Sequence, residues 1–362
     1  MPTSSKQAGA GPVNRTAAPA APLTIVLADA GAPFDGALRA ERPMGGAEGA
    51  LCDLAAALAA RGHRVSAHTR TDRRIDHAGV AWRPLADGLP ESADLYVANR
   101  ASKLIGAVPR ARRRAFWVHN DARHLGKPKF LAPLLRWRPE VVFVGAWHAG
   151  TCPWWIPRRR RRVIPLAVQP LFRAEAPRQP PPPRAVFAGN PERGLPWLLE
   201  LWRTRVQPEL PEAELQVYSG ALYAGAQDAR LAELAQRARA AAGRGVTFHA
   251  PVAPAELARA FQSARLLPYP AWPPETFCLT VAEAQAGGLP VVARPYGAMP
   301  ERIADGATGA LADDDASFAE ACLRLLRDDA LWQSRHRAAL ARADAWTWDD
   351  AAAAFEALAR PD

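Results

Sequence analysis

The sequence predicts an α/β protein made of two doubly wound parallel-sheet domains that face each other across a cleft. Short apolar strand patterns alternate with helical patterns along most of the chain. The alternation begins at residue 23, is interrupted by a proline-rich segment at 176–184, and restarts at residue 185. Four consecutive prolines cannot continue a helix or a central strand, so the domain boundary is expected there. A length of 362 residues is sufficient for two such domains.

The first domain is expected over residues 23–175. It opens with a strand at 23–27, followed by a glycine-containing loop, a helix over 50–61 and a strand at 64–68. This order indicates a βαβ unit of a parallel sheet. Further apolar runs that are typical of buried strands lie at 94–98, 115–118, 141–144 and 163–164. Residues 1–22 lack the apolar block of a signal peptide and are expected to be a disordered leader.

The second domain is expected over residues 185–330, after the linker at 176–184. Its strand patterns lie at 185–188, 215–218, 246–249, 265–268 and 290–293. Helical patterns lie between them, starting at residues 195, 226, 254 and 279. Residues 331–362 are expected to be C-terminal helices, broken near Trp346 and Trp348, and crossing back to the first domain is one arrangement open to them. Parallel sheets bind ligands at the carboxyl ends of their strands, so chemistry is expected in the loops after the strands.

The chain is basic, with 46 Lys and Arg against 36 Asp and Glu and a formal net charge of +10. This charge favours an anionic partner, whether a phosphorylated ligand, an acidic lipid or nucleic acid. An arginine-rich proteome explains it equally well. The four cysteines are far apart in the sequence, so they suggest neither a zinc site nor a disulfide framework, and the reducing cytoplasm is favoured. No apolar run approaches the about 18 residues that span a bilayer.

The segment Pro273-Pro274-Glu275-Thr276-Phe277-Cys278-Leu279 and the residues after it carry the strongest chemical signal. The two prolines prevent a helix from extending upstream, so Glu275 is expected to be exposed in a loop, with a helix starting just after it. Glu283 is expected about two turns into that helix. Free N–H groups at a helix start suit a diphosphate, and a carboxylate can accept both hydroxyls of a ribose. The alternative is that the two glutamates form only a helix cap and a solvated face.

Three further places at strand or helix ends hold candidate site residues. Gly45 and Gly46 precede the first long helix, where glycines let a backbone approach an anion closely, although ordinary turns use them too. His119 follows the predicted strand at 115–118, and its alternative is a structural histidine. Arg193 lies in the loop after the first strand of the second domain, and by itself it is equally well explained as a surface arginine.

From residue 275 to residue 293 the sequence Glu-Thr-Phe-Cys-Leu-Thr-Val-Ala-Glu-Ala-Gln-Ala-Gly-Gly-Leu-Pro-Val-Val-Ala resembles the signature of the retaining glycosyltransferases of family 4, the glycosyl transferases group 1. The match continues through residues 297–301 and 305–309. It is specific over about residues 185–325 and weaker, but consistent in order, over about 23–170. The resemblance implies the GT-B fold, in which two Rossmann-like domains face each other across a cleft.

The resemblance also implies roles for the residues of the second domain's signature. Glu283 would bind the donor ribose, and Glu275 would lie by the donor sugar. The backbone facing the diphosphate and the sugar would be that of Phe277, Cys278 and Leu279.

Two loops and one histidine are assigned in the same way. Arg193 would stand where the family usually has lysine and would neutralise the donor diphosphate. Asn190 stands nearest the place of a second, upstream arginine, so one of the usual two cations is missing. Gly45 and Gly46 resemble the family's glycine loop, and His119 resembles its active-site histidine.

The resemblance implies transfer of a sugar, with retention at its anomeric carbon, from a nucleotide-sugar donor to a glycan, a lipid-linked acceptor or another cell-envelope acceptor. Because the candidate residues include no Asp-x-Asp motif, we expect no metal requirement, and no cofactor beyond the donor substrate. The alternatives are a hydrolase or epimerase of the same fold and a non-catalytic protein that binds nucleotide-sugars. Nucleic-acid binding is suggested only by the charge, with no accompanying motif, and is not expected.

Trp154 and Trp155 precede a run of five arginines, residues 158–162. Such a segment could dock on an anionic membrane, which would place a cytoplasmic protein peripherally on the inner face of the membrane. The favoured alternative is a solvated loop with its tryptophans in the core. Pro153 and Pro157 argue against a long amphipathic helix here.

Overall fold

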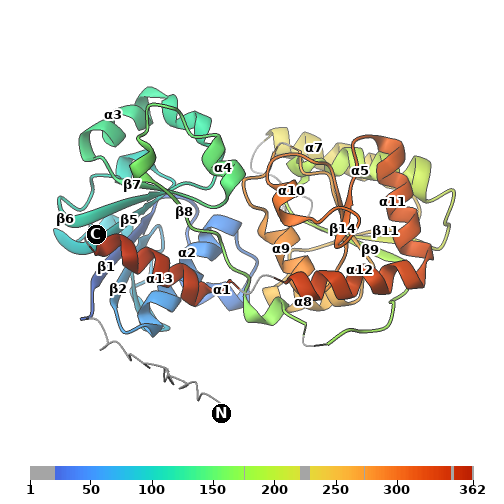
Figure 1. Cartoon of the computed structure of the whole chain (residues 1–362), viewed down its shortest axis with the longest axis horizontal. Helices are drawn as coiled ribbons and strands as arrows, with labels where there is room; N and C mark the ends of the chain where they lie inside the picture. The colour runs from blue at the N-terminus through green and yellow to red at the C-terminus, as the bar shows by residue number, and fades with distance from the viewer. Residues whose placement is uncertain (1–20, 175, 221–228, 273, 344–345, 361–362) are drawn as a thin grey trace, which may run out of the picture.

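The structure, a computed structural model, describes residues 21–174, 176–220, 229–272, 274–343 and 346–360. Within these ranges the chain forms two α/β domains that lie side by side, which confirms the predicted fold class (Figure 1). The predicted leader lies almost entirely outside the described residues. So do residue 175 at the predicted domain end, Pro273, and the first residues of the helix predicted from 226.

The first domain is built on a sheet whose strands, in the described residues, follow the order β3-β4-β2-β1-β5-β6-β7-β8. The strands are β1 (Thr24–Asp29), β2 (Arg64–Thr69), β3 (Ile75–His77), β4 (Val80–Pro84), β5 (Ser92–Asn99), β6 (Arg110–Trp117), β7 (Glu140–Phe143) and β8 (Arg161–Val163). Neighbouring strands are parallel except in the β3–β4 hairpin. The helices are α1 (Leu38–Glu41), α2 (Gly46–Ala60), α3 (Pro128–Trp137) and α4 (Ala146–Gly150).

The central strand β1 explains why helices cover both faces of this sheet. Ile25 and Leu27 enter one apolar core, whereas Val26 and Ala28 enter the other. Successive side chains of a strand point to opposite faces, so a strand that is apolar at every position has to be covered on both.

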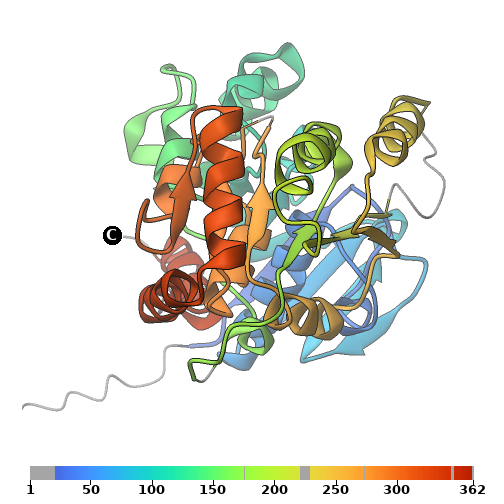
Figure 2. The same cartoon turned by 90° about the vertical axis from the view of Figure 1, so that its right-hand side faces the viewer.

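The second domain repeats this architecture with two three-stranded parallel sheets, in the orders β11-β10-β9 and β12-β13-β14. The strands are β9 (Arg184–Ala188), β10 (Glu214–Tyr218), β11 (Val246–His249), β12 (Leu267–Tyr269), β13 (Val291–Ala293) and β14 (Gly309–Leu311). The two sheets meet where the N–H of Val186 donates to the carbonyl oxygen of Leu266 at 3.0 Å. Helices lie on both sides of these strands (Figure 2): α5 (Leu195–Leu201), α7 (Ala229–Ala241), α8 (Pro254–Gln262), α9 (Leu279–Ala286), α10 (Met299–Arg302) and α11 (Asp315–Arg327).

The chain passes from the first domain to the second earlier than the sequence predicts. Ala167 belongs to a core of the first domain, whereas Val168 belongs to the core of the second. The proline-rich segment 176–184 follows this crossing and lies along the second domain, where the carbonyl oxygen of Pro183 accepts from the N–H of Glu214 at 3.0 Å. Prolines cannot donate to a strand, but their carbonyl groups remain acceptors, so the segment binds to the sheet edge without joining the sheet.

The C-terminal helices divide between the domains. Helices α11 and α12 (Asp329–Arg342) stay with the second domain, where the indole N–H of Trp332 donates to the carbonyl oxygen of Arg265 at 2.7 Å. The second domain therefore extends past residue 330. Helix α13 (Trp348–Ala359) lies across the first domain (Figure 1) and completes its core, with the ring of Phe355 packed against Trp117 at 5.1 Å.

Helix α2 and strand β6 begin earlier than predicted, and the β3–β4 hairpin was not expected at all. Helix α2 starts at Gly46 instead of residue 50, because Gly45 takes the extended N-cap conformation. Strand β6 starts at Arg110, since the arginines before its apolar part pair with β5 even though their side chains remain exposed.

Trp154 contradicts the favoured interpretation that the tryptophans of its segment lie in the core. Its side chain is 89% exposed, whereas Trp155 packs partly against the core. The guanidinium group of Arg161 donates to the carbonyl oxygens of Pro153, Trp154 and Ile156. These bonds fix a tight turn that directs Ile156 inward and leaves Trp154 in solvent.

Candidate active site between the two domains

The start of α9 lies at the centre of the candidate site. Cys278 caps this helix in the left-handed conformation, with φ 65°, and so turns the chain sharply from the preceding loop into Leu279. For a residue with a side chain this conformation costs about 1 kcal/mol, which the surrounding packing has to offset. The first N–H groups of α9 have no carbonyl partner within the helix and carry partial positive charge, as a diphosphate site requires.

Glu275 is held in a tight loop beside this helix start. The guanidinium group of Arg193 pairs with it at 3.0 Å, from Nε to Oε1, and the hydroxyl of Tyr269 donates to the same oxygen at 2.6 Å. Gly297, with φ 63°, lets its loop pack onto Glu275, since a Cβ there would lie 2.3 Å from the carbonyl oxygen of Glu275. The expectation that Glu275 is exposed is therefore wrong: these neighbours leave its side chain only 12% exposed.

Glu283 is the fifth residue of α9, so it lies just over one turn into the helix and not two. Its carboxyl group is close enough to Arg39 and Asp53 of the first domain for both to act on its charge. Arg39 and Asp53 form an ion pair of their own at 2.9 Å. Burial raises the pKa of Glu283 to about 8, an effect that Arg39 opposes and Asp53 reinforces. The carboxyl group is thus in the interface and largely uncharged at neutral pH.

The predicted glycine loop faces the start of α9 from the first domain. Gly45 caps α2 with an extended backbone, and a Cβ on it would lie 2.3 Å from a carboxylate oxygen of Glu48. A Cβ on Gly46 would lie 3.6 Å from a methyl carbon of Leu279. The structure therefore brings Gly46 and Leu279 together from opposite domains, close enough for a van der Waals contact.

His119 follows β6 and lies on the same interface. Its carbonyl oxygen accepts from the hydroxyl of Thr276 in the second domain at 2.5 Å, and its ring packs on Trp117 at 4.6 Å. Burial, followed by the nearby Arg100 and His148, holds the pKa of His119 well below its usual range, so the imidazole is neutral. Its Nε2 atom is buried without a hydrogen-bond partner among the described residues, and a ligand hydroxyl at this place would satisfy it.

Three charged residues of the first domain that the sequence interpretation did not single out also lie here. Asp29, at the end of β1, is fully buried and pairs with Arg100 at 2.8 Å. Arg100 follows β5, has φ 59°, and pairs with Glu48 at 3.0 Å. The sequence could have indicated Asp29 and Arg100 as site residues, because each closely follows an apolar run. Both strands end at the side of the sheet that faces the cleft.

Two contacts tie the second domain to the first beside these residues. A carboxylate oxygen of Glu301 accepts from the backbone N–H of Trp147 at the start of α4. The side chain of Phe277 is buried in a core of the first domain, with the guanidinium group of Arg302 4.4 Å from its ring centre. Only the backbone of Phe277 is therefore left to face a donor.

A cavity of about 460 Å³ lies beside the site, at the hinge. Its lining includes Leu166 and Trp346, from the two segments that cross between the domains, together with Phe277 and Gln285 of the second domain. Phe277 is the one candidate donor residue among the residues that line it, so we do not assign the donor to this cavity.

The sequence does contain one Asp-x-Asp pattern outside the candidate residues, Asp313-Asp314-Asp315. Asp314 caps α11 by accepting from the N–H of Ser317 at 2.7 Å, and Asp315 pairs with Arg294 at 2.5 Å. These two carboxylates are thus engaged in a helix cap and an ion pair. Across the described residues, no group of three His, Cys, Asp or Glu side chains is arranged to hold a metal ion.

The arrangement of the domains matches solved glycosyltransferases. Sucrose-phosphate synthase from Thermosynechococcus elongatus aligns with a TM-score of 0.71 at 19% identity, over 92% of this chain and 98% of that chain. HepE from Anabaena, solved in complex with UDP-glucose, aligns with a TM-score of 0.68 at 17% identity, over 93% and 98%. The fold is therefore GT-B, the two-domain fold of one large class of glycosyltransferases.

Residues 182–328, which form most of the second domain, match the family model of the glycosyl transferases group 1, and this part of the chain is a member of that family. The D-inositol 3-phosphate glycosyltransferase of Arthrobacter sp. (strain FB24) is 36% identical over 173 residues, which are 46% of this chain and 40% of the relative. That of Corynebacterium diphtheriae is 39% identical over 115 residues, 31% of this chain and 27% of the relative. The matched segments thus span less than half the length of these curated relatives.

Proposed function

We propose that the protein is a retaining glycosyltransferase that moves a sugar from a nucleotide-sugar donor to an acceptor hydroxyl. The observation that carries this proposal is the meeting of the candidate donor residues across the interface. Gly46 lies against Leu279, Thr276 donates to His119, and Arg193 pairs with Glu275 beside the same helix start. Such a convergence of glycine loop, helix start and charged pair suits a diphosphate with a sugar on each side.

In the proposed reaction the acceptor oxygen bonds to the anomeric carbon on the face from which the diphosphate departs. The bond from that carbon to the phosphate oxygen breaks, the diphosphate leaves with the electron pair, and the acceptor proton passes to the departing phosphate oxygen. The protein then has to stabilise the charge that grows on the diphosphate. The first N–H groups of α9 and the guanidinium group of Arg193 support this role, because Arg193 has enough donors to keep Glu275 and also contact a phosphate.

The donor class that we propose is a nucleoside diphosphate sugar, and the acceptor class is a glycan or a lipid-linked hydroxyl. The HepE structure holds UDP-glucose, and the curated relatives are named for an inositol phosphate acceptor. The neutral imidazole of His119 would hydrogen-bond the transferred sugar near the reacting carbon. The carboxyl group of Glu283 would accept the ribose hydroxyls after losing its proton.

The proposal is tested by screening UDP-, GDP- and ADP-sugars for thermal stabilisation and then following turnover with candidate acceptors. We expect one nucleotide class to raise the melting temperature, because a ligand that binds only the native state stabilises it. Nuclear magnetic resonance of the first product should show the anomeric configuration of the donor. An inverted product, or no stabilisation by any nucleotide-sugar, would contradict the proposal.

The same assay separates the two rival functions. Turnover without an acceptor would indicate a hydrolase or epimerase. Binding without turnover would indicate a non-catalytic protein, which the missing second cation favours. Asn190 stands in its place and accepts from the N–H of Glu192 at 3.0 Å, so it serves as a cap of a short 3-10 helix.

We further propose that transfer needs no metal ion. With about 10 mM chelator we expect the rate to stay within about twofold of the untreated rate, because Arg193 and the helix start supply the positive charge that Mg²⁺ supplies elsewhere. A parallel assay with added Mg²⁺ serves as the control. Complete loss of transfer in chelator, restored by Mg²⁺, would show that the charge comes from a metal.

We also propose a cytoplasmic location for the protein. All four cysteines are buried and unpaired, which supports a reducing compartment. In the described part of the chain, no helix has the length and apolar character needed to cross a membrane.

A further inference from the structure

The positive charge of the chain is concentrated in one segment of the first domain. Residues 100–167 contain 16 Lys and Arg but only two acidic residues, Asp121 and Glu140, and so carry a formal net charge of +14. The rest of the chain carries −4. A generally arginine-rich composition does not explain this distribution, because it would make both domains basic.

Few of these cations are neutralised within the protein. Arg123 pairs with Asp121 at 2.8 Å, and Arg162 pairs with Glu140 at 3.2 Å, which uses both acidic residues of the segment. Within the described ranges, no acidic side chain forms an ion pair with Lys127, Lys129, Arg136, Arg138, Arg158 or Arg159. These side chains are therefore available to an external anion.

Two large apolar side chains are exposed among these cations. Trp154 is 89% exposed, and Leu135 on α3 is 57% exposed. Helix α3 buries Phe130 and Leu134 against the core, so Leu135 and its neighbour Arg136 lie on the opposite, outer face. Leaving a tryptophan and a leucine in water forgoes the free energy of burying them, and exposed apolar side chains within a charged surface are typical of interaction sites.

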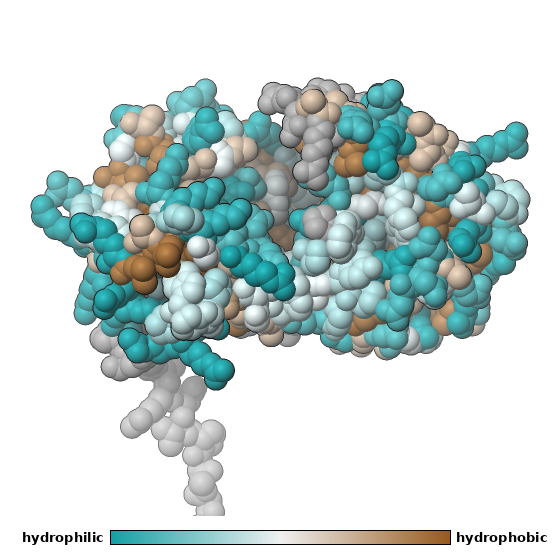
Figure 3. Space-filling view, turned by 90° about the horizontal axis from the view of Figure 1, so that it is seen from above, coloured by the Kyte–Doolittle hydropathy of each residue, from teal (hydrophilic) through white to brown (hydrophobic). Residues whose placement is uncertain are grey.

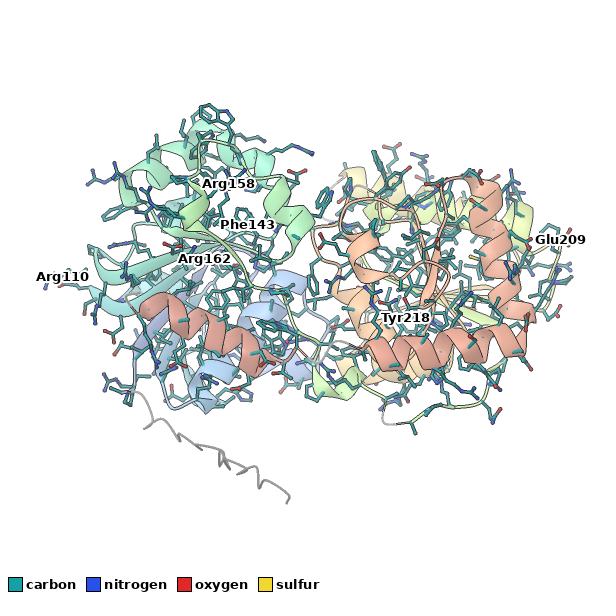
Figure 4. The ribbon with its side chains drawn as sticks, viewed as in Figure 1. Arg110, Phe143, Arg158, Arg162, Glu209 and Tyr218 are labelled. Carbon is teal, nitrogen blue, oxygen red and sulfur yellow. The ribbon has the colours of Figure 1, made fainter. Side chains whose placement is uncertain are left out.

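The two exposed segments belong to one surface. In Figures 1 and 2 both α3 and the segment after α4 lie at the top of the first domain. The guanidinium group of Arg160 donates to the carbonyl oxygen of Arg138, which links the arginine turn to the end of α3. Figure 4 shows Arg158 in the upper part of this domain, above the labelled Phe143 and Arg162.

We propose that this surface, formed by Lys129, Leu135, Arg136, Trp154, Arg158 and Arg159, docks the protein on an anionic membrane. Trp154 and Leu135 would enter the interfacial layer while the arginines and the lysine contact acidic head groups. Exposed Leu135 favours a membrane over nucleic acid as the partner. Moving an aliphatic side chain from water into an apolar phase lowers the free energy, and a phosphate backbone offers no such phase.

The docked orientation has a consequence for access to the site. Figure 3 views the molecule from above, and on this face the surface is hollowed between the two domains. Docking through the top of the first domain therefore turns the opening between the domains toward the bilayer. The inference that a lipid-linked acceptor reaches the site from the membrane rests on the proposed function. The inference that the surface binds a membrane does not.

The docking is tested by sedimentation of the full chain with vesicles of phosphatidylcholine alone and with about 30% phosphatidylglycerol. We expect strong binding only to the anionic vesicles, weakening as salt is raised. Arg158→Glu/Arg159→Glu should lower the partition coefficient at least about 25-fold, because each basic residue contributes about fivefold. Trp154→Ala/Leu135→Ser should lower it about tenfold or more, since most of the buried apolar area is lost.

Matched controls make the same kinds of substitution in the second domain, away from the proposed surface. Arg324→Glu/Arg337→Glu alters two exposed arginines of the second domain, and Trp272→Ala removes another exposed tryptophan there, so both should bind vesicles as the natural chain does. Melting curves establish that every variant is folded. Equal binding to neutral and anionic vesicles, or unchanged binding of Trp154→Ala/Leu135→Ser, would overturn the proposal. So would duplex DNA that binds as tightly as the anionic vesicles and needs the same arginines. The readout is independent of transfer, so its failure would leave the proposed function standing.

Discussion

Replacing Glu283 by glutamine will weaken binding of the nucleotide-sugar donor about 10- to 100-fold at pH 8. The carboxylate is expected to accept two ribose hydroxyls, and hydrogen bonds to a charged group contribute about 1.5–3 kcal/mol each. Glutamine keeps one acceptor oxygen and the shape of the side chain, so the fold should be unaffected. Titration calorimetry measures the affinity, with Glu320→Gln on the exposed face of α11 as the control.

The same variant should also lose a pH dependence. The pKa of Glu283 is about 8 in the donor-free protein, so binding in the charged form releases a proton below that pH. Donor affinity of the natural chain should therefore rise up to about tenfold per unit from about pH 6 to pH 8 and then level off, whereas Glu283→Gln should show no such rise. Equal affinities at all pH values for both proteins would remove Glu283 from the donor site.

Rising pH should strengthen donor binding but weaken the stability of the donor-free protein. Burial raises the pKa of Glu283 above its value in an unfolded chain, so ionisation opposes folding, and the donor-free protein loses stability as pH rises from the unfolded pKa toward about 8. Glu283→Gln should therefore melt at a higher temperature than the natural chain near pH 8, while binding the donor less well.

Replacing His119 by alanine will lower turnover about 100- to 1000-fold while donor affinity stays nearly unchanged. The neutral imidazole is expected to act on the sugar in the transition state, and loss of one such hydrogen bond has an effect of this size. The contact between domains should survive, because Thr276 donates to the backbone carbonyl oxygen of His119 and not to its ring.

Steady-state kinetics separates this role from a structural one. A lower kcat with an unchanged donor affinity is expected, with partial rescue in His119→Asn, which keeps a hydrogen-bonding side chain. His77→Ala, on an exposed strand of the same domain, is the matched control. A fully active His119→Ala, or one that merely unfolds at lower temperature, would assign His119 to packing.

The elements that could be predicted from the sequence are those with strong local patterns. The apolar run at residues 23–27 predicted β1 to within a few residues. Pro274 before α9, and Gly287 and Gly288 after it, predicted the start and end of this helix. The segment from Glu275 to Ala293 indicated the candidate donor residues because it resembles the family's signature.

The expectations that failed depended on side-chain contacts that the pattern of apolar and polar residues does not specify. Glu275 is covered because Arg193, Tyr269 at the end of β12 and the loop of Gly297 all contact it. Trp154 is exposed because Arg161 ties down its turn. Even where the partner is near in sequence, as Arg161 is to Trp154, the contact depends on how the chain folds back and not on hydrophobic periodicity.

By itself, the sequence determined the alternation of strands and helices and the two-domain organisation, because periodicity, prolines and glycines act over a few residues. Its resemblance to a known signature indicated the candidate donor segment. The tertiary structure alone decided which charges meet. It brought Asp29, Arg100 and Glu48 together, set Glu283 near Arg39, and packed α13 onto the first domain. The physical reason is that burial and charge pairing depend on contacts between segments up to hundreds of residues apart, which local propensities do not encode.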